Sequence, residues 1–113
     1  MRDKFQTSLL ADMRDSAAAA AICRYLEGID KGGFYANGEK QDAVLRRLEI
    51  IGEAAERISP EVQKEFPGIP FREIRGMRNI IAHDYGEVDL ERVWETVTHD
   101  IPNLLKVLGE DLQ

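Results

Sequence analysis

The sequence predicts an all-α protein, an antiparallel up-and-down four-helix bundle whose C-terminal helix is kinked or split. Apolar residues recur at helical spacing through most of the chain. Glycine, proline and asparagine interrupt this spacing at a few points and divide the chain into helix-length segments. No segment has the alternating pattern of a strand, and 113 residues suit a single domain with one core, so we expect no second domain.

The first helix is expected from about Asp3 to Leu26. This segment is rich in good helix formers, includes the alanine run at 17–21, and contains neither glycine nor proline. Gly28 should end the helix, and a loop rich in turn residues should follow as far as Gly38.

The second helix should begin near Glu39, and it has two apolar sides. One stripe contains Val44, Leu48, Ile51, Ala55 and Ile58, and the other contains Ala43, Ile50 and Ala54. Such a helix is either central in the core or covered by a partner. In so small a domain we favour a second copy of the chain, and therefore a homodimer.

Proline and aspartate mark the remaining helices. Ser59-Pro60 either ends the second helix or starts a short new one, and Pro70 opens the third helix. Asp89 should cap the fourth helix. Pro102 should then kink that helix or start a separate final one, because its ring removes a hydrogen bond and clashes with the preceding turn.

Composition limits the kinds of partner. The formal net charge is −6, from 21 acidic and 15 basic residues, so any contact with nucleic acid should be local. A single cysteine, Cys23, excludes an internal disulfide and suits a reducing cytoplasm. We see neither a signal peptide nor a membrane-spanning segment, and two histidines with one cysteine provide no metal-ligand spacing. We therefore expect a cytoplasmic protein without a cofactor, a metal or membrane contact.

The run from Arg78 to Tyr85 gathers polar side chains at the end of an apolar helical segment. Arg78 carries a forked cation that fits phosphate oxygens, and the ordinary pKa of a histidine such as His83 lies near cellular pH. RNA carries its own nucleophile, the 2′-hydroxyl. A metal-independent ribonuclease therefore needs mainly a proton carrier, here His83, and a cation that stabilises the phosphorane, here Arg78.

Three further residues of this run can support the reaction. Asn79 can orient His83 or the scissile phosphate, and Tyr85 can bind phosphate or stack on a base. Asp84 would repel the phosphate unless it points away or orients the imidazole.

The helical angles set a condition on the site. At 100° per residue, Arg78 and His83 project about 140° apart, so one regular helix cannot aim both at one phosphate. Either the last turn unwinds before His83, or two copies of the helix face each other and each supplies side chains.

A purely structural interpretation also exists. Arg78 would then form an ion pair, and His83 would be a helix-end residue that the helix dipole favours. Glu49 and Glu53 lie one turn apart and are candidates to pair with an arginine across the bundle. A further set of basic residues forms either a local rim for RNA or a solvated face: Arg46, Arg47, Arg72 and Arg75.

The run resembles the motif of the HEPN superfamily, an arginine, four residues, a histidine, any residue and a tyrosine, and most closely its HepT-like branch. The segments 43–55, 76–79, 88–90 and 93–94 resemble other signatures of that branch. The resemblance is strong from about Gln41 to Leu108 and covers the first helix only by pattern. Two features depart from the branch: Phe71 stands where relatives often have tryptophan, and the first helix is unusually rich in alanine.

The resemblance implies a single HepT-like HEPN domain over residues 1–113, all-α and homodimeric, with the motif at the cleft between protomers. It also implies a metal-independent endoribonuclease that acts as the toxin of a type VII-like toxin–antitoxin system. The expected partner is an MntA-like nucleotidyltransferase antitoxin that neutralises the toxin by transferring AMP to the motif tyrosine, here Tyr85. The alternative is a non-catalytic helical binding subunit of a minimal nucleotidyltransferase, in which Arg78 and His83 together would have no evident purpose.

Overall fold

The computed structural model describes residues 3–18, 27–83, 86 and 88–111. Within these ranges the chain contains helices and turns and no strand, which confirms the all-α prediction. The elements are α1 (Lys4–Ala18), α3 (Lys31–Tyr35), α4 (Gly38–Glu56), α5 (Pro60–Gln63), α6 (Phe71–His83), α7 (Leu90–Glu95), the π-helical turn η2 (Thr96–Asp100) and α8 (Ile101–Asp111). None of the described helices is long and apolar enough to cross a bilayer.

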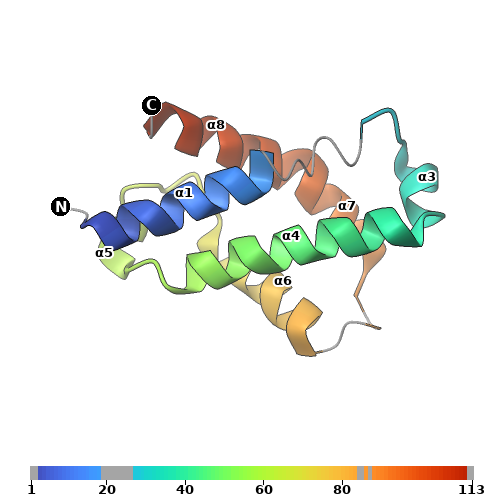
Figure 1. Ribbon diagram of the computed structural model, residues 1–113, viewed down its shortest axis with the longest axis horizontal. Coiled ribbons are helices and arrows are strands. Elements are labelled where there is room, and N and C mark those ends of the chain that lie inside the picture. Colours follow the sequence, from blue (N-terminus) through green and yellow to red (C-terminus); the bar gives the residue numbers. More distant parts are fainter. Residues whose placement is uncertain (1–2, 19–26, 84–85, 87, 112–113) are drawn as a thin grey trace.

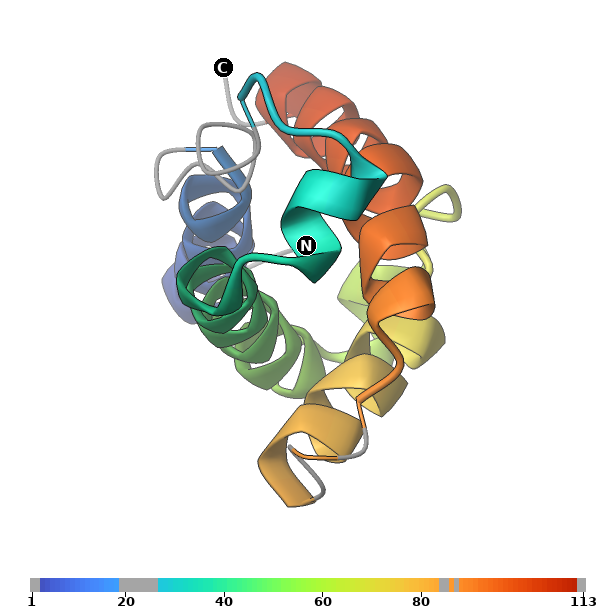
Figure 2. The ribbon, with the colours of Figure 1, turned by 90° about the vertical axis from the view of Figure 1, so that its right-hand side faces the viewer.

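Helix α4 is the central element of the fold. It packs against α6 and α1, and α1 also packs against α8. Figure 1 shows α1 and α4 side by side along the long axis of the molecule, and Figure 2 shows the long helices arranged around a common centre. The side chains of that centre form one continuous apolar core, to which every helix from α1 to α8 contributes.

The central position of α4 accounts for much of its second apolar stripe. Ala54 is buried within the chain, and Ala43 and Ile50 are partly buried. The sequence left two explanations open, a helix central in the core or a helix covered by a partner. Because neighbouring helices of the same chain cover α4, the first explanation applies. The stripe alone is therefore weak support for a dimer.

Helix α3 corrects the expectation of a continuous loop before α4. Asp30 caps this short helix by accepting a hydrogen bond from the backbone N–H of Gly33 at 2.8 Å. Phe34 is fully buried, and its ring centroid lies 5.6 Å from that of Trp94. Burial of one aromatic side chain thus holds a turn that contains two glycines in helical form, and α3 covers one end of the bundle (Figure 2).

The first helix is described only to Ala18. The expected continuation to Leu26, which includes Cys23, lies outside the described residues. Ser59 caps the short helix α5, so the proline after it starts a new helix, which was one of the two alternatives.

The predicted kink or split of the C-terminal helix takes the form of a π-helical turn, because the chain is helical without a gap from α7 through η2 to α8 and no separate final helix forms. Asp89 caps α7 by accepting hydrogen bonds from the backbone N–H groups of Glu91 and Arg92. The wider π-helical turn η2 then precedes Pro102, whose ring cannot donate a hydrogen bond to the previous turn. Within η2 the Thr98 hydroxyl donates to the carbonyl of Trp94 at 2.7 Å, which satisfies a backbone group near the irregular turn.

Candidate active site

Helix α6 carries the candidate catalytic residues on its border and its outer face. Its apolar face is buried, through the side chains of Phe71, Ile74, Met77 and Ile81. Asn79 and His83 are exposed on the outer face, whereas the side chain of Arg78 lies at the border with α4 and is 25% exposed. The amphipathic pattern of the helix therefore fixes which residues face solvent and which contact α4.

Gly52 of α4 allows the side chain of Arg78 to pack closely against α4. A Cβ atom at position 52 would overlap the Cβ of Arg78, and it would lie 2.7 Å from the Arg78 Cγ and 3.2 Å from the carbonyl oxygen of Ile74. No side chain larger than hydrogen fits there unless the helices move. A glycine inside a helical pattern often signals such a close approach, and this signal was available in the sequence.

The Arg78 guanidinium is only partly satisfied within the chain. Its Nη1 donates to Asn79 Oδ1 at 3.1 Å and lies 3.7 Å from Glu56 Oε2. Its Nε is buried and has no hydrogen-bond partner among the described residues. A buried donor without a partner is costly, and the exposed part of the guanidinium can donate to a phosphate oxygen, which is a strong acceptor. The arginine is thus held in place with binding capacity left over.

The acidic partner of Arg78 differs from the sequence prediction. Glu49 pairs with Arg46 on its own helix at 2.7 Å, so the prediction that it reaches across the bundle is wrong. Glu56 approaches Arg78 instead. It lies two turns beyond Glu49 on the same face of α4, so the helical spacing that suggested Glu49 and Glu53 also contained the correct residue.

His83 is the last residue of α6 and is exposed. The helix is regular up to this residue, so the alternative in which the last turn unwinds before His83 is wrong. The projection angle of about 140° between Arg78 and His83 on a regular helix therefore applies. The two side chains therefore leave α6 in different directions.

The supporting residues divide into two groups. Asn79, predicted to orient His83 or the phosphate, contacts the Arg78 guanidinium. Asp84 and Tyr85 lie outside the described residues, and so does any contact that they make. Within the described ranges, no group of three or more His, Cys, Asp or Glu side chains could hold a metal ion.

The described residues form an all-helical domain in which one helix carries both an arginine and a histidine, and this defines the class as a small helical domain. Comparison with known proteins then identifies the family: the profile described as Ribonuclease HepT-like matches residues 16–110. The chain belongs to the HepT-like ribonuclease family, and this membership supports its assignment as a ribonuclease.

Several archaeal relatives agree with this assignment. The candidate RNase MJ0125 of Methanocaldococcus jannaschii is 39% identical over 85 residues, which are 75% of this chain and 73% of the relative. The candidate RNase MJ1380 of the same organism is 35% identical and covers 88% of this chain and 89% of its own. The candidate ribonuclease HepT of Thermococcus cleftensis is 44% identical over 63% of this chain and 64% of its own. No solved structure matches the chain.

Proposed function

We propose that the protein is a metal-independent endoribonuclease toxin whose active site forms between two copies of the chain. One observation carries this proposal: α6 is regular to His83, so Arg78 and His83 project about 140° apart. In addition, the buried Nε of Arg78 has no hydrogen-bond partner in the part of the chain that the structure describes. A second α6 that faces the first, related by a two-fold axis, would bring the arginine of one copy to the histidine of the other.

The proposed reaction uses the 2′-hydroxyl of the RNA as nucleophile. His83 accepts its proton, the 2′-oxygen forms a bond to phosphorus, and the bond from phosphorus to the 5′-oxygen breaks as that oxygen takes up a proton. Arg78 binds the phosphate and stabilises the charge of the phosphorane, and Asn79 holds the guanidinium in place. The products are a 2′,3′-cyclic phosphate and a 5′-hydroxyl.

The outer face of α6 also supports a second copy of the chain as neighbour. Ile80 follows Asn79 and is 45% exposed, which makes it one of three large apolar side chains exposed among the described residues. An apolar residue between two candidate site residues suits an interface that is covered when the site is complete.

The partner in this proposal is a nucleotidyltransferase antitoxin that transfers AMP to Tyr85. The modification would add bulk and negative charge beside the phosphate site and exclude RNA. Its test is mass spectrometry after incubation with ATP and a nucleotidyltransferase encoded beside this protein. We expect one added AMP on the wild type and none on Tyr85→Phe, and AMP on the variant would contradict this assignment.

The experiment for the ribonuclease is cleavage of a labelled RNA in the presence of EDTA. The wild type should cut internally, whereas Arg78→Ala and His83→Ala should lose at least about 100-fold in rate, as expected for a lost charge stabiliser or proton carrier. Matched controls are Arg57→Ala and His99→Ala, which remove the same residue types from exposed positions outside the site and should cut like the wild type.

If purified wild-type protein and all four variants leave RNA equally intact, the ribonuclease proposal is wrong. A non-catalytic subunit of a nucleotidyltransferase would then be the better account. If cutting stops when EDTA is added and returns with a divalent ion, the metal-independent mechanism is wrong.

A further inference from the structure

A groove of about 440 Å³ lies at the start of α6, away from the Arg78–His83 end. Its apolar wall comes from the start of α5 and from the segment that joins α5 to α6, with prolines at positions 60, 67 and 70. Its charged lining consists of Lys64, Arg72 and Arg75 and a single carboxylate, Glu73. The groove is therefore cationic on a protein whose formal net charge is −6.

The three cations of this groove have no partner in the described part of the chain. Their side chains form no ion pair or hydrogen bond with other described residues, in contrast to Arg14, Lys31, Arg46 and Arg78. In a chain with more acidic than basic residues, three such cations around one groove make a local surface for a polyanion.

The outer face of α6 leads from this groove to the candidate site. Arg72 and His83 are eleven residues apart, so they project within about 20° of each other on a regular helix, with Asn79 about 20° to the other side of Arg72. The distance between them along the axis is about 16 Å, which a stacked strand of about five nucleotides spans at ~3.4 Å per phosphate. Ile80, which we place against the second copy, projects about 80° from Arg72 on the side of Glu73, so a strand cut at His83 can reach the groove along the Arg72 side of this helix.

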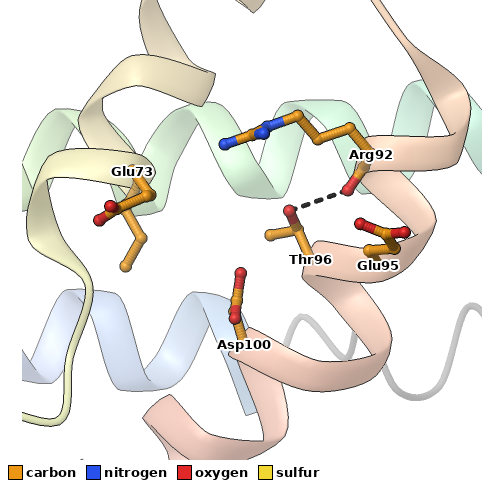
Figure 3. Close-up of a pocket in the computed structure, with 6 residues that line it drawn as sticks. Glu73, Arg92, Glu95, Thr96 and Asp100 are labelled. Atoms are coloured by element: carbon orange, nitrogen blue, oxygen red, sulfur yellow. Dashed lines mark hydrogen bonds between the residues drawn. The ribbon is translucent and has the colours of Figure 1, made fainter.

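The opposite flank of α6 has a different charge. A pocket of about 140 Å³ between α6 and the α7–η2 segment is lined by Glu73, Glu95 and Asp100, with Arg92 as its one cation (Figure 3). Carboxylates repel an RNA backbone, so the favourable path along α6 is on the side of Arg72 and Arg75.

We infer that the groove lined by Lys64, Arg72 and Arg75 binds the phosphates of the RNA strand a few nucleotides from the cleaved bond. This inference rests on the proposed ribonuclease function and adds a second subsite to it. The contacts are to the backbone and the side chains are flexible cations, so the groove should favour longer strands without selecting their sequence.

The test compares two triple variants with equal charge changes. The groove variant carries Lys64→Gln, Arg72→Gln and Arg75→Gln, and the control carries Lys4→Gln, Lys40→Gln and Lys106→Gln at positions outside the groove and the site. Substrates are made by shortening an RNA from either end around its mapped cut site. With the wild type and the control, KM should rise at least about tenfold once the strand no longer spans the face of α6. The groove variant should have a high KM for every length and an unchanged kcat.

Binding of an RNA with a 2′-deoxy nucleotide at the cut site provides a readout that does not need cleavage. The slope of log affinity against log salt should decrease in magnitude by about 2 in the groove variant relative to the control, at ~0.7 for each lost phosphate contact on a single strand. If the two triple variants have the same slope and the same dependence on length, the inference is wrong. In that case the groove has another occupant, such as an acidic protein surface.

These readouts separate the two proposals. If the wild type cuts no RNA but the salt slope of the groove variant is smaller than that of the control by about 2, the result contradicts the ribonuclease proposal and supports RNA binding in the groove. A wild type that cuts RNA while the groove variant behaves like the control contradicts the groove and leaves the ribonuclease intact.

Discussion

Gly52 is the residue on which the position of Arg78 depends. Glycine is ordinarily a poor choice inside a helix, and replacement by alanine at an open helical position stabilises by up to ~1 kcal/mol. At position 52 the added methyl group would overlap the arginine side chain and press on the backbone of α6. The local preference for alanine and the packing against α6 therefore oppose each other, and packing should dominate.

We predict that Gly52→Ala lowers the free energy of unfolding by about 1–3 kcal/mol, the range for overpacking of a close contact. It should also reduce RNA cleavage at least tenfold, because Arg78 must move. Denaturant unfolding and initial cleavage rates measure the two effects. In an Arg78→Ala background the same change should cost no further activity while it still costs stability.

Gly38→Ala provides the control for this prediction. Gly38 is on the same helix, and a Cβ atom there would have no neighbour within 4 Å. Its substitution should change stability by less than about 0.5 kcal/mol and leave cleavage at the wild-type rate. A Gly52→Ala protein as stable and active as Gly38→Ala would show that the close contact has no influence on Arg78.

At the level of single residues, the sequence suggested candidate chemistry but did not predict the contacts around it. Arg78, Asn79 and His83 were identified because their side chains suit phosphate and proton transfer. Glu56 and Gly52 were missed, because which residue of α4 meets Arg78 depends on how α4 and α6 are placed against each other. That placement is set by tertiary packing, and local spacing only narrows the choice.

Several helices begin at capping residues that can be recognised in the sequence. Asp89 accepts backbone hydrogen bonds at the start of α7, and this cap was predicted from the residue type and its position. Helix α3 was missed since it has only five residues and is held by the buried Phe34 ring, a contact that forms only in the folded chain. Local signals therefore predicted the capped helices, whereas α3 depends on burial in the folded chain and was not predicted.

The cap of α7 provides a test at this scale. Asp89→Ala should lower the free energy of unfolding by about 1 kcal/mol, because two backbone N–H groups lose their acceptor. Asp89→Asn should keep most of that stability, as asparagine caps about as well as aspartate. Thermal unfolding of the three proteins measures this. An asparagine variant as unstable as the alanine variant would mean that the charge of Asp89, and not its cap, stabilises the helix.

On the scale of the whole molecule, the central question is whether one chain or two chains bring Arg78 and His83 to the same RNA phosphate. The structure of one chain provides a partly satisfied Arg78 on one side of α6 and an exposed His83 on another. The helical angles predicted this separation from the sequence, and in our proposal a second copy of the chain overcomes it. Our account therefore depends on two chains, each of which supplies one half of each site.

The most direct test isolates defined heterodimers by placing different affinity tags on two co-expressed chains. In our account a dimer of an Arg78→Ala chain and a His83→Ala chain retains one complete site of two, and roughly half of wild-type activity. A dimer of a wild-type chain and an Arg78→Ala/His83→Ala chain has no complete site and should be inactive. The opposite pattern, with the first dimer inactive and the second half active, would place both catalytic residues of each site in one chain and contradict the account. Failure to recover any dimer that carries both tags would contradict it as well.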